Sequence, residues 1–173
     1  MNNHYIELLE LKKKQNDGIA LAFGCFDVLH TGHIAFVEKV HNLTSLPVFI
    51  GVLSDKTVSD RKGPDRPVFT ENDRAHIMGA LKHVEQAFVI NERGNFELYK
   101  KEFNLTDSDE EFWCTAIYCL DVLRPTEFYY SSDFKINEQI QTFFESRNIK
   151  TFVVQYTENV SSTQYIDRIK NNN

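Results

Sequence analysis

A run of five apolar residues, 19–23, constrains the fold of this chain more than any other segment. The run follows turn-forming residues at 16–18 and ends at Gly24, and it contains no polar alternation, which is typical of a strand buried on both faces. From Gly32 onwards, apolar residues recur at helical spacing. A buried strand that leads directly into a helix predicts a parallel sheet covered by helices.

The same alternation of apolar runs and helical patterns continues along the chain. Further strands are expected at residues 48–53, 87–90, 128–130 and 151–154, and helices at 4–14, 71–81, 112–123, 136–144 and 161–170. Thr70 is predicted to cap the second of these helices, with Asp73 at its third position. We therefore predict an α/β fold: a single Rossmann-like, three-layer domain over residues 1–173, with a parallel central sheet. Ligands of such sheets bind at the carboxyl ends of the strands, where Gly24 and Ser54 stand.

Composition excludes several classes of function. Hydrophobic residues make up 42% of the chain and charged residues 25%, a balance typical of a soluble globular protein. The net charge of -6 argues against nucleic acid as a partner, although a local positive spot still allows a small anion to bind. Cys25, Cys114 and Cys119 lack the spacing of a metal site, which favours a reduced, cytoplasmic location. No apolar run suits a signal peptide or a membrane span, so no membrane association is expected.

The segment between the first strand and the following helix carries the main functional signal. It reads GCFDVLHTGH, from Gly24 to His33. The loose backbone N–H groups at the start of the helix stand at the ligand-binding edge of the sheet, ready to bind phosphate oxygens. Gly24 leaves room for a nucleotide to approach the backbone. His30 and His33 are separated by two residues, so both imidazoles can face one phosphate and stabilise the charge that develops on it during transfer.

Two other interpretations of the histidine pair are weighed against this one. An isolated H-x-x-H pattern is most often two ordinary histidines in a turn. A zinc site is a further alternative, but the pattern lacks a nearby cysteine or carboxylate as third ligand and lies in a loop rather than within one helix. The position of His30 and His33 between a strand and a helix favours the phosphate site.

Other polar positions fit the same chemistry, each with a plainer alternative. The polar stretch 54–66 is expected to be a functional loop in which Lys62 binds phosphates as a point charge, although a lone lysine is most often a solvated surface residue. Arg74, in the first turn of its helix, opposes the helix dipole unless an anion lies nearby. Residues 161–163 start a helix, where capping explains one hydroxyl only. Asp27, at a strand end, fixes either the histidines or the loop, and Asp133 faces the acceptor; each is alternatively a turn former.

Four motifs in order resemble those of the HxGH nucleotidyltransferases, in particular the cytidylyltransferase-like group. They are GCFDVLHTGHIAFVEKV; the SD, KGPDRPV and DR run from Ser54 to Arg74; LRP leading to SDF at 132–134; and YTENVSST leading to Ile166 and Arg168-Ile169. The resemblance spans about residues 18–170 and is closest to heptose-phosphate adenylyltransferases, with glycerol-3-phosphate cytidylyltransferase next.

The resemblance implies a reaction and a site. The chain would transfer AMP or CMP from a nucleoside triphosphate to a phosphorylated sugar or polyol and release pyrophosphate, with ATP slightly favoured. Mg²⁺ would arrive with the triphosphate, and no protein metal site is implied. A CTP-dependent, glycerol-3-phosphate-type enzyme is the alternative, and a nucleotide-binding regulator without catalysis is the alternative of another class, against which the intact HTGH argues. The implied catalytic residues are His30, His33, Lys62 and Arg74; the nucleotide-binding residues are Gly24, Cys25, Phe26, Asp27, Gly32, Ser161, Ser162 and Thr163; the acceptor-binding residues are Asp133, Ser54 and Asp55.

The chain departs from the family pattern in two places. Residues 130–134 read YSSDF where the heptose-type enzymes have a lysine, two glycines, an aspartate and a tyrosine, which leaves the acceptor open. Segment 91–123 is a divergent insertion, for which a lid, a dimer surface or a changed acceptor pocket are the alternatives; the second would make the protein a homodimer. Its residues Trp113, Cys114 and Tyr118 are expected to serve in packing.

Overall fold

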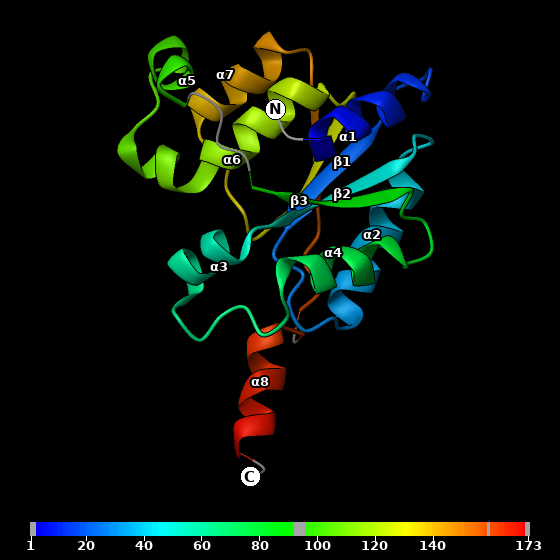
Figure 1. The fold of residues 1–173 in the computed structure, drawn as a ribbon, viewed down its shortest axis with the longest axis vertical. Coiled ribbons are helices and arrows are strands. Elements are labelled where there is room, and N and C mark those ends of the chain that lie inside the picture. The colour runs from blue at the N-terminus through cyan, green and yellow to red at the C-terminus, as the bar shows by residue number, and fades with distance from the viewer. Residues whose placement is uncertain (1–2, 92–95, 159, 172–173) are drawn as a thin grey trace.

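The computed structural model describes residues 3–91, 96–158 and 160–171, arranged around one parallel sheet (Figure 1). The strands are β1 (Ala20–Gly24), β2 (Val48–Leu53), β3 (Gln86–Ile90), β4 (Glu127–Ser131) and β5 (Lys150–Val154). Their order is β3-β2-β1-β4-β5, and every pair is parallel. The predicted α/β fold and all five expected strands are confirmed. The chain reverses its direction of travel across the sheet between β1 and β4, which makes their carboxyl ends the natural ligand site.

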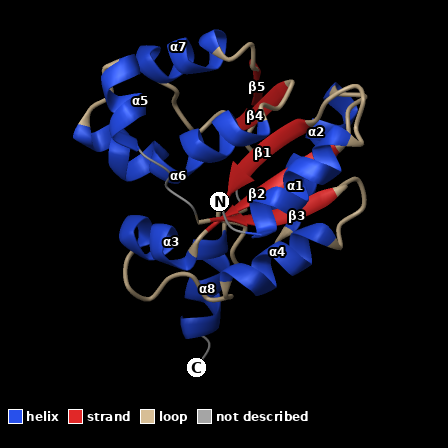
Figure 2. Ribbon diagram, turned by 45° about the horizontal axis from the view of Figure 1, so that its top comes forward, coloured by secondary structure: helices blue, strands red, loops and turns tan. Residues whose placement is uncertain are grey.

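Helices cover both faces of the sheet and its carboxyl edge (Figure 2). They are α1 (Asn3–Lys13), α2 (Thr31–Leu43), α3 (Asp55–Lys62), α4 (Glu71–Gly79), α5 (Phe96–Phe103), α6 (Asp107–Leu123), α7 (Glu138–Ser146) and α8 (Ser162–Asn171). One face carries α1, α5, α6 and α7, and the other carries α2 and α4. The short helix α3 lies near the carboxyl edge of the sheet, and α8 runs from there away from the body of the domain.

Two apolar cores, one on each face, hold the layers together. Strand β2 is buried along its whole length, and Leu21 and Phe49 point to one core while Ala22 and Ile50 point to the other. This alternation follows from the pleat of the strands and explains why the central strands read as continuous apolar runs. The core under α5, α6 and α7 is rich in buried aromatic side chains, which are Tyr5, Phe49, Phe88, Phe96, Tyr99, Phe103, Trp113, Phe128, Phe143 and Phe144.

The predicted loop at 54–66 is wrong over most of its length. Residues Asp55–Lys62 form helix α3, and the side chain of Ser54 caps it by accepting a hydrogen bond from Thr57 N at 3.2 Å. The helix presents one buried residue, Val58, so it has no apolar periodicity that could reveal it. By contrast, Thr70 caps α4 as predicted: its hydroxyl accepts from Asp73 N at 3.2 Å.

The divergent segment forms two helices that pack on the sheet. The predicted helix at 112–123 is confirmed within α6, whereas α5 was not predicted. Trp113 is buried and lies edge-on to Phe144 at a centroid distance of 6.1 Å, and Tyr118 makes a similar contact with Tyr5, so both serve in packing as predicted. The side chain of Cys114 lies outside the described residues. No helix in the described part of the chain is long and apolar enough to cross a membrane.

Candidate active site

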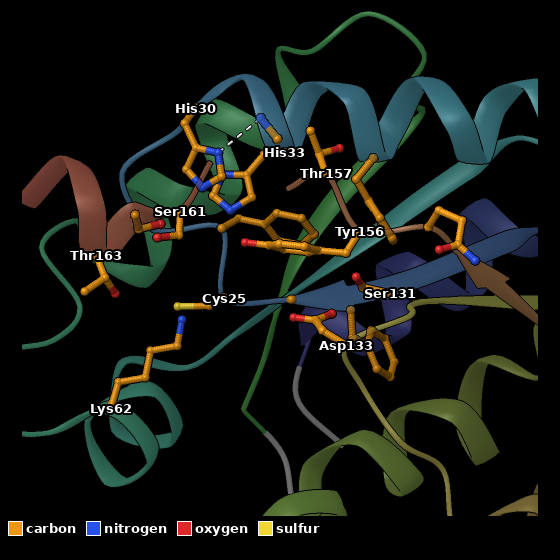
Figure 3. A pocket seen from close by; sticks show the side chains of 17 residues that line it. Cys25, His30, His33, Lys62, Ser131, Asp133, Tyr156, Thr157, Ser161 and Thr163 are labelled. Carbon is orange, nitrogen blue, oxygen red and sulfur yellow. Dashed lines mark hydrogen bonds between the residues drawn. The ribbon is translucent and has the colours of Figure 1, made fainter. Parts of the chain in front are cut away.

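A cavity of about 270 Å³ lies where β1 and β4 end (Figure 3). Segments far apart in the sequence meet there: the loop after β1, the end of α3, the end of β4, and the start of α8. Eleven of the predicted site residues line it, and they are Gly24, Cys25, Phe26, His30, Gly32, His33, Lys62, Asp133, Ser161, Ser162 and Thr163. The fold therefore brings most of the predicted site residues to one cavity.

His30 stands at the exact start of α2, as its N-cap residue. Its ring Nδ1 accepts a hydrogen bond from Gly32 N at 3.1 Å. Because Nδ1 is the acceptor, the neutral ring carries its proton on Nε2, which is left as a donor. A Cβ atom on Gly32 would lie 2.9 Å from the His30 ring, so only glycine lets the imidazole lie against the helix start.

His33, one turn further along α2, lies against His30. The two rings stack with a centroid distance of 3.8 Å and an interplanar angle of 27°, and the edge of His33 meets Phe26 at 5.4 Å. Burial, assisted by the nearby His30 and Lys62, lowers the pKa of His33 to about 3. Burial and Lys62 also hold the pKa of His30 below its ordinary value. Both rings are therefore neutral at pH 7 and can act as hydrogen-bond donors rather than as fixed charges.

Lys62 faces the histidine pair from the opposite wall of the cavity. It comes from the last turn of α3, and its ammonium group points toward Cys25 and the start of α8 (Figure 3). Its charge is one of the causes that lower the pKa of His30 and His33. A phosphate between the two walls would meet imidazole donors on one side and an ammonium on the other.

The loop after β1 is held in a costly backbone conformation. Phe26 and Val28 both have φ of 50°, in the left-handed region, which a β-branched residue such as valine rarely adopts. A Cβ atom on Gly24 would lie 2.7 Å from the Phe26 ring, so the folded-back ring requires glycine at that position. Such local strain persists only where surrounding contacts enforce it, and it is concentrated at functional sites.

Asp27 supplies one of these enforcing contacts. Its carboxylate is buried and accepts hydrogen bonds from Val68 N and Phe69 N at 3.0 Å and from Arg66 Nε at 2.9 Å. Burial by itself raises the pKa of Asp27, but the two backbone amides and the Arg66 guanidinium outweigh it, so the pKa lies below its ordinary value. Of the two roles weighed for Asp27, the structure supports the one in which it fixes the loop.

Arg74 is not part of the cavity wall. Its side chain is fully buried, and its guanidinium donates to Cys25 O and Asp55 Oδ1 at 2.6 Å each and to Phe69 O at 3.0 Å. Arg74 therefore lies behind the loop that follows β1, and its guanidinium binds the backbone of that loop at Cys25 O. Asp55 serves as the partner of Arg74, and Ser54 serves as the cap of α3. Neither of them reaches the cavity, contrary to the acceptor-binding role that the resemblance implied.

The three hydroxyls at the start of α8 have three different environments. Ser161 and Gln164 cap the helix reciprocally, each side chain bonding to the other's backbone N–H at 3.2–3.3 Å. The buried hydroxyl of Ser162 donates to Asp27 O and so ties the two halves of the site together. Thr163 lines the cavity. Capping thus accounts for one hydroxyl, as the sequence suggested.

No site role was predicted for the segment after β5, although Tyr156 and Thr157 open the fourth motif. Gln155, Tyr156 and Thr157 line the cavity, and Lys39 on α2 anchors them by donating to Gln155 O at 2.8 Å and to Thr157 Oγ1 at 3.2 Å. The available signal was their position immediately after an expected strand, at the carboxyl edge. The structure does not describe Asn159. Among the described residues, no group of three or more histidine, cysteine or acidic side chains is placed to hold a metal ion.

A second cavity, of about 330 Å³, adjoins the first. It lies on the α6 side of the β1 end and has Trp113, Ala116, Tyr130 and Phe134 in its wall. Six residues line both cavities, and they are Phe23, Gly24, Cys25, Lys62, Ser131 and Asp133. Two ligands could therefore meet beside Gly24 and Lys62.

Comparison with known proteins shows the family to which the chain belongs. A sequence model of the cytidylyltransferase-like family matches residues 21–168. The bifunctional protein HldE of Syntrophotalea carbinolica is 27% identical over 164 residues, which is 94% of this chain and 29% of that protein. HldE of Helicobacter pylori, strain Shi470, is likewise 27% identical over 164 residues, 95% of this chain and 30% of the relative. The chain thus spans about three tenths of the length of these relatives.

Solved structures share the fold at low sequence identity. A lipopolysaccharide core biosynthesis protein from Thermoplasma volcanium matches with a TM-score of 0.55 and 22% identity, over 83% of this chain and 99% of the other. Pantothenate synthetase from Thermus thermophilus matches with a TM-score of 0.56 and 17% identity, over 94% of this chain and 68% of the other. The match over residues 21–168 shows that the chain belongs to the cytidylyltransferase-like family, and the solved structures share its fold.

Proposed function

We propose that this chain transfers a nucleoside monophosphate from a nucleoside triphosphate to a phosphorylated sugar or polyol. The observation that carries the proposal is the stacked pair of neutral imidazoles, His30 and His33, opposite Lys62 at the carboxyl end of β1. Similarity to the HldE proteins over almost the whole of this chain supports a sugar phosphate as the acceptor class.

In this proposal the triphosphate occupies the first cavity. Its base and ribose lie toward Gln155–Thr157, and its phosphates extend past the histidines toward the starts of α2 and α8, where the positive ends of the helix dipoles favour anions. Mg²⁺, carried in with the triphosphate, would neutralise part of the phosphate charge. ATP is slightly favoured over CTP by the motifs near Lys62 and Ser161.

The transfer itself is an in-line displacement. An oxygen of the acceptor phosphate forms a bond to the α-phosphorus, the bond from that phosphorus to the α–β bridging oxygen breaks, and pyrophosphate leaves with the electron pair. Imidazole N–H donors of His30 and His33 would bind the α-phosphate oxygens as their charge grows, and Lys62 would balance the charge of the β- and γ-phosphates. Arg74 and Asp27 would act indirectly, because they hold the loop that carries the histidines.

Pyrophosphate release tests this proposal. The protein is incubated with ATP or CTP, Mg²⁺ and a panel of sugar and polyol phosphates, and wild type is compared with His33→Gln. We expect acceptor-dependent release that falls on the order of 100-fold or more in the variant. His76→Gln, which removes an exposed histidine of α4 outside both cavities, should match wild type. Triphosphate binding without release under every condition would leave a binding protein and refute the proposal.

A further inference from the structure

The second cavity has a chemistry unlike that of a sugar site. The wall away from the first cavity includes an apolar part, built from Leu53, Val58, Ala116 and Phe128, and these side chains offer no hydrogen-bonding atom. A buried hydroxyl without a partner loses its hydrogen bonds to water and gains none in exchange. Every hydroxyl that a ligand carried against this wall would therefore weaken its binding.

Aromatic rings form the side of the cavity. Trp113 and Phe134 meet edge to face with a centroid distance of 5.4 Å and an angle of 68°, and Tyr130 and Phe134 meet at 6.2 Å and 74°. Rings set nearly perpendicular to one another in this way make a rigid corner with large apolar surfaces. Trp113 comes from α6, in the divergent segment, and Tyr130 comes from the end of β4, so the corner joins two elements that are far apart in the sequence.

Polar side chains are concentrated where the second cavity joins the first. Lys62, Ser131 and Asp133 line both cavities, so they lie at the junction with the proposed triphosphate site. Arg61, beside Lys62 in the last turn of α3, adds a second positive side chain to the second cavity. A phosphate group would be attracted to this junction, and the rest of the molecule that carries it would extend into the apolar interior.

We infer that the acceptor is a phosphomonoester whose body is a ring or branched carbon skeleton with few hydroxyl groups, rather than a heavily hydroxylated sugar or an open-chain polyol. This inference rests on the proposed transfer but departs from its acceptor class, because it excludes the polyols and the heavily hydroxylated sugars. The phosphate lies at the junction beside Lys62, within reach of the α-phosphate, and the body fills the cavity bounded by Trp113, Tyr130 and Phe134.

A matched pair of phosphates tests the inference. Cyclohexyl phosphate and glucose 1-phosphate share a six-membered ring and one phosphate, and they differ chiefly in the hydroxyl groups. Trp113 is the chain's only tryptophan and lines the cavity, so its fluorescence reports binding directly, in the presence of a non-hydrolysable triphosphate. We expect cyclohexyl phosphate to bind at least about tenfold more tightly than glucose 1-phosphate. Equal or tighter binding of glucose 1-phosphate to the wild-type protein would overturn the inference, without any variant being needed.

A cavity-filling variant places the binding site. Ala116→Leu places a larger side chain in the apolar part of the wall, and it should abolish the fluorescence response to cyclohexyl phosphate while leaving triphosphate binding unchanged. Ala80→Leu, at an exposed position after α4, should behave as wild type. Unchanged phosphate binding by a folded Ala116→Leu protein would overturn the inference. Pyrophosphate release distinguishes failure of the proposed acceptor class from failure of the proposed transfer. If hydroxylated sugar phosphates support pyrophosphate release, and Ala116→Leu leaves this release unchanged, the inferred acceptor class is wrong but the proposed transfer is supported. If no phosphate supports release, the proposed transfer is wrong.

Discussion

The neutral state of His33 makes the stability of the folded chain dependent on pH in a defined direction. Burial lowers the pKa of this imidazole from 6.5 to about 3, so between these values the unfolded chain binds a proton that the folded chain does not. Stability must therefore fall as the pH falls below 6.5. Each pH unit in this window costs about 1.4 kcal/mol per proton, which gives a loss of about 2 kcal/mol at pH 5 relative to pH 7. A loss of that size is measurable in a domain whose total stability is on the order of 5–15 kcal/mol.

Replacing His33 with Gln isolates this contribution, because all other titrating groups are present in both proteins. Urea unfolding at a series of pH values from 7 to 5 gives the free energy of unfolding of each. We expect wild type to lose about 2 kcal/mol more than His33→Gln over this range. The titration of the His33 ring, followed by NMR in the folded wild-type protein, is the independent control, and it should remain incomplete at pH 5. Parallel stability curves, or a ring that titrates near pH 6.5, would refute the assignment of a buried neutral imidazole.

Three further perturbations address the elements around the histidine pair. Lys62→Met should raise the KM for triphosphate or slow transfer about tenfold or more, whereas Lys56→Met, which removes an exposed lysine of the same helix, should not; equal kinetics for both variants would remove Lys62 from the site. Asp27→Asn should lower the free energy of unfolding by about 3–5 kcal/mol in urea titrations, because the largely buried Arg66 loses its charged partner; a loss below about 1 kcal/mol would show that the loop does not depend on this ion pair. Lys39→Met should raise the KM for triphosphate with little change in kcat, because the segment at 155–157 loses its anchor, and an unchanged KM would contradict that role.

The elements that were predictable from sequence are those whose local pattern and tertiary environment agree. The central strands β1 and β2 are buried along most of their length, so their apolar runs indicate their positions directly. Helix α3 was missed because its single buried residue, Val58, leaves no periodic signal, and α5 lies outside the motifs that were interpreted. Local patterns report burial of one segment at a time, and these short helices depend on contacts with the rest of the domain.

The site residues that could be predicted from the sequence are those that lie in a local motif. His30, His33 and Lys62 stand in motifs whose spacing indicates their chemistry, and the fold brings them to one cavity. Arg74 was assigned a phosphate because a cation in the first turn of a helix needs an anionic partner, and the structure supplies that partner as Asp55, 19 residues earlier. The second cavity depends on Trp113 packing against Phe134, a tertiary contact that neither segment indicates by itself.

The fate of the individual phosphates of the triphosphate distinguishes nucleotidyl transfer from other reactions of the triphosphate. The protein is incubated with Mg²⁺, the best acceptor of the panel, and triphosphate labelled with ³²P at either the α or the γ position. We predict that the α-label moves to the acceptor conjugate while the γ-label leaves in pyrophosphate, because the proposed reaction is attack on the α-phosphorus between the histidine pair and Lys62. Transfer of the γ-label to the acceptor, or release of inorganic phosphate with no α-labelled conjugate, would contradict nucleotidyl transfer.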